Sequence, residues 1–195
     1  MLYNNQESTV LHLFQKETEI GTLFIYPIKL PEDAVTIHEW VNQPYAKFWD
    51  MENTKLNKVF DAYQKIIEDK HHNAYLGVLN NQPIFLCESY SALHDDIADF
   101  YDAKDTDLGM HILVGLAQKR IPNFTWNIFC FVMDFFFDYL NAERVVVEPD
   151  VNNDKIHVLN KKAGFNYLRV VQLANKKAHI ALNTKESYLK AIATL

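Results

Sequence analysis

His111 is the side chain whose type and setting most favour catalysis. It lies in the segment 107–115, where alternating residues predict a β-strand with two unlike faces. One face is apolar, and the other carries His111 together with Gly109 and Gly115. Glycine within a strand can let a ligand approach the backbone closely. Because imidazole titrates near neutral pH, His111 could take a proton from a substrate; the strand alone favours a half-buried histidine that bonds a neighbour.

A second polar group follows the segment Arg144–Pro149, which is rich in valine and typical of a short strand. Period two places Glu148 and Asp150 on one face of this strand. If a helix connects it in parallel to the His111 strand, Asp150 lies at a carboxyl strand end, where open α/β sheets place ligand sites. Asp150 could then orient His111 or hold the cationic end of a substrate. The alternative is an N-cap or Asx-turn residue for a helix that starts near Asn153.

The segment 117–123 connects the His111 strand to an apolar helix. A loop that enters a helix presents unpaired N–H groups and the positive end of the helix dipole, and both favour phosphate. Lys119 and Arg120 add positive charge there. These features fit an anionic cofactor, although any strand–helix turn looks similar.

The overall composition restricts the class of protein. The 195 residues are 49% hydrophobic and 23% charged, and we expect them to form one domain spanning 1–195. The net charge is −6 with no dense Lys/Arg cluster, which argues against nucleic acid as a partner. The N-terminus lacks the features of a signal peptide, and the longest apolar stretch, 128–140, is too short to span a bilayer. A cytoplasmic protein that does not enter the membrane is expected.

Cysteine and histidine spacing gives no sign of a metal site. Cys87 and Cys130 lie in apolar runs and are expected to be buried small hydrophobes. No bound metal is predicted, because the histidine pairs lack the spacing of metal ligands. These pairs are His71 with His72 and His38 with His94.

Hydrophobic periodicity and turn residues predict the elements that position these groups. Strands are expected at 10–14, 22–28, 74–79, 83–90, 108–116, 144–149, 167–173 and 178–182. Helices are expected from 31 to about 41 and at 55–69, 124–140 and 153–162, with a long loop or short helix at 94–107. This order predicts a mixed α/β fold around one largely antiparallel sheet. It contains one parallel strand–helix–strand crossover, from 108 to 149.

Several short motifs resemble the GNAT N-acetyltransferase superfamily. More narrowly, they are similar to its branch that acylates N-hydroxylysine and related hydroxylamines in hydroxamate siderophore assembly, a route of iron acquisition. The resemblance covers about residues 20–183 and implies the GNAT fold. The motifs are D-L-G-M-H at 107–111, E-P-D at 148–150 with Asn153, K-A-G-F at 162–165, H-E-W-V-N-Q-P at 38–44, F-W at 48–49, E-S-Y at 88–90 with Asp96 and Tyr101 after it, and K-K-A at 176–178, which resembles the family's final hairpin.

The resemblance implies direct transfer of an acyl group, with acetyl expected, from acyl-CoA to a hydroxylamine nitrogen. His111 would be the general base and Asp150 its partner. The expected cofactor contacts are Leu113, through its backbone N–H, Val114, Lys119, Arg120, Asn123, Asn153 and Lys162. The expected acceptor contacts are Trp40, Asn42, Trp49, Glu88, Tyr90, Asp107 and Glu148. Trp40 could equally pack in the core, and Asn42 could equally end a helix.

The phosphate loop departs from the family pattern. The wider superfamily has Q/R-x-x-G-x-G/A there, and the siderophore branch usually has Arg-Gly before a proline, whereas Arg120 is followed by Ile121 and Pro122. A catalytically silent acyl-CoA-binding module therefore stays open as an alternative. So does an aminoglycoside acetyltransferase, since aspartates between 95 and 105 could supply an acidic cleft. The oligomeric state, monomer or homodimer, is equally open.

Overall fold

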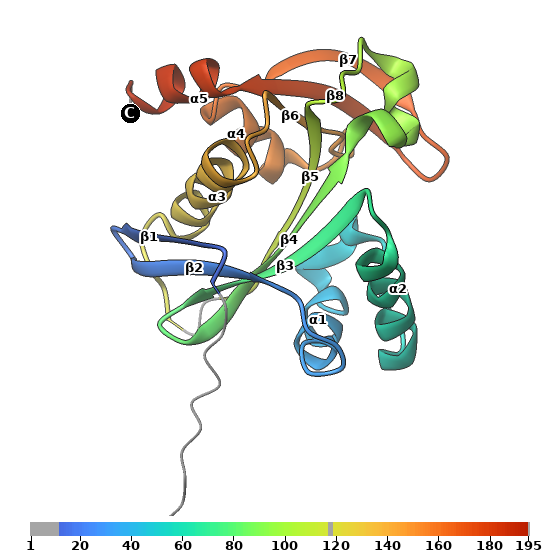
Figure 1. Cartoon of the computed structure of the whole chain (residues 1–195), viewed down its shortest axis with the longest axis vertical. Coiled ribbons are helices and arrows are strands. Elements are labelled where there is room, and N and C mark those ends of the chain that lie inside the picture. The colour runs from blue at the N-terminus through green and yellow to red at the C-terminus, as the bar shows by residue number, and fades with distance from the viewer. Residues whose placement is uncertain (1–11, 117–118, 195) are drawn as a thin grey trace, which may run out of the picture.

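The structure, a computed structural model, describes residues 12–116 and 119–194 and is organised around one sheet (Figure 1). Its eight strands follow the order β1-β2-β3-β4-β5-β6-β8-β7. Neighbouring strands are antiparallel except for β5 and β6, which are parallel. The predicted mixed α/β fold is thereby confirmed. The strands are β1 (Phe14–Thr18), β2 (Gly21–Pro27), β3 (His72–Leu79), β4 (Gln82–Ser91), β5 (Asp107–Val114), β6 (Arg144–Val147), β7 (Asn166–Gln172) and β8 (Lys177–Thr184).

Helices cover both faces of the sheet (Figure 1). Ile37 of α1 and Val59 of α2 pack in a core on one face, whereas Phe131 of α3 and Tyr188 of α5 belong to a larger core on the other. No helix in the described parts of the chain is long and apolar enough to cross a membrane. The helical elements are α1 (Ala34–Val41), η1 (Pro44–Trp49), α2 (Leu56–Glu68), η2 (Ala92–His94), η3 (Asp96–Phe100), α3 (Phe124–Asp134), η4 (Phe135–Tyr139), α4 (Asp154–Lys162) and α5 (Lys185–Ile192), of which η4 is a π-helical turn and the other η elements are 3₁₀ helices.

The first strand differs from its prediction. The expected strand at 10–14 begins outside the described residues, and β1 runs instead from Phe14 to Thr18. Its charged residues are tolerated because β1 is an edge strand with much of its length exposed. The turn to β2 is closed by the Thr18 hydroxyl, which donates to the carbonyl of Gly21 at 2.7 Å.

The central hairpin of β3 and β4 matches its prediction. Asn80 and Asn81 both adopt positive φ, 50° and 63°, as a tight two-residue hairpin turn requires. Asparagine accepts this left-handed region more readily than most residues. The hairpin matters for function because β4 lies next to β5 and places its side chains beside His111.

Two helical elements were not predicted from the sequence. The segment Pro44–Trp49 forms η1, with proline in its first turn. The C-terminal helix α5 begins where the Thr184 hydroxyl accepts a hydrogen bond from the N–H of Ser187, which is an ordinary N-cap. Tyr188 anchors α5 to the core by donating to the carbonyl of Cys130 at 3.2 Å.

The parallel pair opens soon after it begins. Pairing between β5 and β6 starts at Asp107 opposite Arg144 and ends at Gly109 opposite Val146, although β5 continues to Val114. Beyond this point the chain after β6 bonds to β8 instead, because the Pro149 carbonyl accepts from the N–H of His179. The two strands therefore diverge within one sheet, and the functional side chains lie at this divergence.

A buried ion pair fixes the start of the parallel pair. Asp107 is fully buried and accepts from Arg144 through both oxygens, Nε to Oδ1 at 2.7 Å and Nη2 to Oδ2 at 2.6 Å. The Tyr101 hydroxyl and the N–H of Lys104 donate to the same carboxylate. The prediction that Asp107 contacts the acceptor is wrong, because this network occupies its carboxylate and anchors β5 to β6.

Candidate active site

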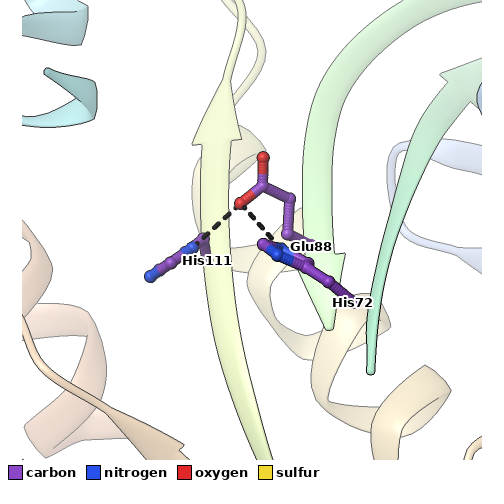
Figure 2. Close-up of side chains that lie close together, drawn as sticks. All are labelled: His72, Glu88 and His111. Carbon is purple, nitrogen blue, oxygen red and sulfur yellow. Dashed lines mark hydrogen bonds and ion pairs between the residues drawn. The ribbon is translucent and has the colours of Figure 1, made fainter. Parts of the chain in front are cut away.

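The site is built on a cross-strand pair. Glu88 of β4 lies directly opposite His111 of β5, so the two side chains point to the same face of the sheet (Figure 2). The Nδ1 atom of His111 lies 2.9 Å from Glu88 Oε2, and its Nε2 atom lies 2.7 Å from Glu148 Oε1. Glu148 reaches this position because it follows β6 directly, where the parallel strands diverge. His111 is thus held between two buried carboxylates.

These carboxylates control the charge of the imidazole. Burial by itself would lower the pKa of His111, but Glu148 and then Glu88 outweigh it and raise the pKa to about 10. Burial would raise the pKa of Glu88, yet contacts with His111 and His72 hold it at about 2. Burial would likewise raise the pKa of Glu148, but the charge of His111 holds this pKa well below its usual value. At neutral pH the site therefore contains an imidazolium between two carboxylates.

Glycine in β5 serves this arrangement. Tyr90 of β4 lies opposite Gly109, and its ring packs where a side chain of residue 109 would be, 2.0 Å from an added Cβ. Across this gap the Tyr90 hydroxyl donates to Glu148 Oε2 at 2.8 Å. A Cβ added at Gly115 would lie 3.1 Å from the ring of Trp40, but Gly115 also lines a cavity. The expectation that the glycines leave space for a ligand is therefore wrong for Gly109, whose space the Tyr90 ring fills, and stays a prediction for Gly115.

Two cavities meet at His111. A first cavity of about 680 Å³ lies between η1, α2, η3 and the β7–β8 turn. A second, of about 700 Å³, follows the divergence between the end of β5 and the segment from Val147 to Ile156. The residues that line both are Lys47, Phe48, Trp49, His111, Glu148, Asp150 and Lys176. The His111–Glu148 contact therefore lies in the wall where molecules in the two cavities would meet.

Asp150 is not the partner of His111. Its Oδ1 accepts from the N–H of Asn152 at 2.7 Å and from the Asn152 side chain at 2.9 Å, which is an Asx turn. Both ring nitrogens of His111 are taken by Glu88 and Glu148. The predicted pairing is thus corrected to the two glutamates. Asp150 still lines both cavities, so a contact with the acceptor stays a prediction.

The residues predicted to cover the acceptor separate into two groups. Trp49 lines both cavities, lies edge-on to His111 at 6.1 Å between ring centroids, and donates through Nε1 to the hydroxyl of Tyr63. Trp40 of α1 packs against the core, and Asn42 donates to the carbonyls of His38 and Thr54. For Trp40 and Asn42 the structure therefore gives the packing and helix-end roles that were the alternatives.

The predicted cofactor contacts are also only partly brought together. Leu113, Val114 and Asn153 line the second cavity, and the Asn153 side chain also caps α4. The ammonium of Lys162 packs over Trp126 at 4.0 Å, outside both cavities. The remaining three, Lys119, Arg120 and Asn123, are exposed in a loop whose residues 117 and 118 lie outside the described part, and their contact with a cofactor stays a prediction.

His72, Glu88 and His111 offer three ligand atoms within 4.8 Å of one another, as a metal would require (Figure 2). His72 Nε2 lies 3.4 Å from Glu88 Oε2, the oxygen that also contacts His111. Protons explain this geometry equally well, because the raised pKa of His111 means that Nδ1 carries a hydrogen that points to Glu88. We interpret the cluster as proton-handling, and the absence of a metal remains a prediction.

Sequence reasoning missed three residues of the site. Tyr63 lies on a helix face that reads as core, and His72 stands beside His71 at the start of a strand, so neither carries a local signal. Lys176 lies in the β7–β8 turn with its Nζ atom 3.3 Å from Glu148 Oε1. Its position in a K-K-A motif similar to the family's last hairpin was the one available hint.

A histidine between carboxylates at the junction of two cavities defines an enzyme that brings two bound molecules together. Residues 29–173 match the model of the acetyltransferase (GNAT) domain family. Since this is well over half of the sequence, the chain belongs to the GNAT acetyltransferase family, and the resemblance seen in the sequence is confirmed. It is therefore an acyltransferase, for which acyl-CoA is the typical co-substrate.

Curated relatives share about a quarter of the aligned residues. N-hydroxyputrescine acetyltransferase of Acinetobacter baumannii is 26% identical, with 76% of this chain and 71% of the relative covered. N(6)-hydroxylysine O-acetyltransferase of Escherichia coli is 20% identical, with 82% and 51% covered. Hydroxyornithine transacylase of Ajellomyces capsulatus is 30% identical, with 72% and 32% covered. The chain thus spans about half of the second relative and a third of the last.

Solved structures support the fold. An uncharacterised protein from Bacillus halodurans superposes with a TM-score of 0.85 at 22% identity, covering 94% of this chain and 95% of that one. The aminoglycoside acetyltransferase AAC(6')-Ib with coenzyme A superposes with a TM-score of 0.74 at 18% identity, covering 86% and 98%. At these identities the likeness concerns the architecture.

Proposed function

We propose that this chain transfers an acetyl group from acetyl-CoA to the hydroxylamine nitrogen of an N-hydroxylated amine in hydroxamate siderophore biosynthesis. The observation that carries this proposal is His111, held between Glu88 and Glu148 in the wall shared by the two cavities. The names of the relatives, which specify hydroxyputrescine, hydroxylysine and hydroxyornithine, support a hydroxylamine acceptor.

The chemistry follows from this placement. The acceptor nitrogen attacks the thioester carbonyl, its N–H proton passes to Nε2 of His111, and the C–S bond breaks to release the CoA thiolate, which then takes up a proton to become the thiol. Glu88 keeps a hydrogen on Nδ1, so a neutral ring presents Nε2 as the proton acceptor. Because Glu148 contacts Nε2, the acceptor's N–H must replace that contact. The backbone near Leu113, beside the second cavity, would bind the thioester oxygen.

The raised pKa of His111 has two opposite effects on this step. It makes the neutral ring a strong proton acceptor, because the imidazolium that forms is stabilised by both carboxylates. It also makes the neutral ring scarce at neutral pH, which limits the rate. A base is most effective when its pKa lies near the working pH, so the balance of charge around His111 decides the turnover.

The second cavity suits an acyl-CoA. It follows the opening between β5 and the chain after β6, and it extends to Phe124 and Thr125 at the start of α3, where the positive end of the helix dipole favours phosphate. Asn160 lines this cavity, and its buried Oδ1 has no hydrogen-bond partner among residues 12–116 and 119–194. A polar molecule such as the pantetheine arm would bind in these surroundings. Lys119 and Arg120 would contact its phosphates from the loop before α3.

The first cavity suits a cationic acceptor. Aromatic side chains of Trp49, Tyr63 and Phe100 form part of its wall, and aromatic faces attract ammonium groups. Its carboxylates outnumber its two lysines, Lys47 and Lys176. This charge supports an N-hydroxylated diamine over an amino acid, which would bring a carboxylate of its own. The carboxylate residues are Asp50, Glu88, Asp95, Asp96, Asp99, Glu148 and Asp150.

A thiol-release assay tests the proposed function. Acetyl-, succinyl- and longer acyl-CoAs are each combined with N-hydroxyputrescine, N-hydroxycadaverine, N6-hydroxylysine, N5-hydroxyornithine, unhydroxylated cadaverine and kanamycin. Fastest release is expected with acetyl-CoA and a hydroxylated diamine, and mass spectrometry should then find the hydroxamate. Thiol release with kanamycin and none of the other acceptors would move the protein to aminoglycoside acetylation. If none of the acceptors gave thiol release, a catalytically silent acyl-CoA-binding module would be favoured.

A further inference from the structure

We propose that Lys176 is a positioning residue that sets the pH range in which His111 can accept a proton. The inference rests on the proposed function, in which His111 is the base. The Nζ atom of Lys176 lies 3.3 Å from Glu148 Oε1, and His111 Nε2 lies 2.7 Å from the same oxygen. Two cations thus share one carboxylate oxygen and are at most about 6 Å apart. The lysine offsets part of the negative charge that stabilises the imidazolium.

The backbone holds Lys176 in this position. Its carbonyl accepts from the N–H of Leu173 at 2.9 Å and from the Gln172 side chain at 3.2 Å, which closes the β7–β8 turn. The next residue, Lys177, accepts through its carbonyl from the N–H of Val151, three residues after Glu148. The two segments that carry the Glu148 and Lys176 side chains are therefore hydrogen-bonded to each other. The backbone therefore fixes the distance between the Lys176 ammonium and the Glu148 carboxylate, and with it the effect of the lysine charge on His111.

The surroundings of His111 would otherwise be strongly anionic. On the β4 side lie Glu88 and Tyr90, with His72 of β3 behind Glu88. Trp49 of η1 packs edge-on to the ring, and Glu148 follows β6. The other charged residues that line the two cavities around it are Lys47, Asp50, Asp95, Asp96, Asp99, Asp150, Asp154 and Lys155. Among the lysines and arginines of the described residues, Lys176 is the one that forms an ion pair with a carboxylate in contact with His111.

The expected effect follows from Coulomb's law. Two unit charges about 6 Å apart change each other's pKa by about 0.5 unit in water-like surroundings and by about 2 units at an effective dielectric constant of 20. Removing the Lys176 charge should therefore raise the pKa of His111 by about 0.5 to 2 units. At a fixed pH below that pKa, kcat/KM should fall by roughly 3- to 100-fold, in proportion to the neutral fraction of the imidazole.

Direct titration of His111 tests this inference without relying on a substrate. Ring resonances of histidine-labelled protein are followed by NMR against pH in the wild type and in Lys176→Met, with Lys176→Gln as a second charge-removing variant. Lys176→Arg should keep the wild-type pKa because it restores the charge. Lys177→Met is the matched control, since it removes the same charge from the adjacent, exposed position.

The expected result is an alkaline shift of the His111 titration in Lys176→Met and Lys176→Gln, absent from Lys176→Arg and Lys177→Met. The ascending limb of the kcat/KM profile, where His111 loses its proton, should move with it. An unchanged titration in both charge-removing variants, or an equal shift in Lys177→Met, would overturn the inference. If the shift occurs but no acceptor gives thiol release, the coupling between Lys176 and His111 stands and the proposed function fails. If a hydroxylamine acceptor is turned over but the His111 titration does not shift, the proposed function stands and the coupling fails.

Discussion

The Asp107–Arg144 ion pair gives a stability prediction that separates structure from substrate binding. Asp107→Asn keeps the shape of the side chain and removes its charge, which leaves the Arg144 guanidinium without its buried counter-ion. Breaking a buried pair from one side typically costs about 3–5 kcal/mol. Arg144 retains some exposure and asparagine keeps one acceptor oxygen, so we expect a loss of about 2–4 kcal/mol in the free energy of unfolding. For a chain of this length the melting temperature should fall by roughly 4–16 °C.

Urea denaturation measures this loss, with Asp105→Asn as the control because Asp105 is exposed two residues earlier. The Asp107 pKa is lowered in the folded state: burial acts to raise it, and Arg144 outweighs burial. The stability that the Asp107 carboxylate contributes is therefore present above its pKa in the unfolded chain and is lost as the pH falls. The difference in the free energy of unfolding between Asp107→Asn and the wild type should therefore shrink below about pH 4. The KM for the acceptor should stay near the wild-type value at temperatures where both proteins are folded. A loss under about 1 kcal/mol with a large rise in KM would refute the structural role and restore a substrate contact.

Three further outcomes are expected. Gly109→Ala should lower stability by about 1–3 kcal/mol in thermal denaturation and reduce turnover, because its Cβ would displace the Tyr90 ring that holds Glu148; an unchanged enzyme would contradict this. Glu148→Gln should lower the pKa of His111, because it removes the carboxylate charge that raises this pKa most, whereas Asp150→Asn should leave the His111 pKa nearly unchanged; NMR titration of both variants checks this, and the reverse order would return the role of partner to Asp150. Dialysis against a chelator should leave kcat unchanged. If the activity were lost on dialysis and restored by an added divalent metal, the cluster of His72, Glu88 and His111 would be a metal site.

Alternation along the chain was sufficient to predict the sheet and the faces of its strands. The His111 strand, the valine-rich strand before Glu148 and the helix between them all have strong local signals, and their parallel pairing follows from the crossover rule. The edge strand β1 was less predictable, because its polar sequence has no alternating pattern of its own and its position is specified by its pairing with β2. Propensity likewise gave no reason to expect η1, which depends on Pro44 and on packing around Trp49.

The site itself could be predicted only as far as single strands allow. His111 stood out as a titratable side chain in an apolar strand, but its catalytic role was predicted only with the expected Asp150 pairing and the resemblance of the flanking motifs to the GNAT family. Its partners were misassigned, because register decides them: Glu88 is opposite His111 only in the β4–β5 pairing, and Glu148 reaches Nε2 only where β5 and β6 diverge. The choice between Glu148 and Asp150, which share a face, depends on a turn that period two cannot describe. The contact of Lys176 with Glu148 could not be predicted from strand patterns, since the β7–β8 hairpin near the end of the chain brings Lys176 to the site.

The central claim is that His111 accepts the proton during acyl transfer. The most direct test is His111→Ala, assayed for kcat with acetyl-CoA and the best hydroxylamine acceptor, with the Kd for acetyl-CoA measured separately by calorimetry. We expect kcat to fall by about 10²- to 10⁴-fold while the Kd changes by less than about three-fold. Full turnover in the alanine variant would contradict the claim, as would a loss of activity explained entirely by weaker acetyl-CoA binding.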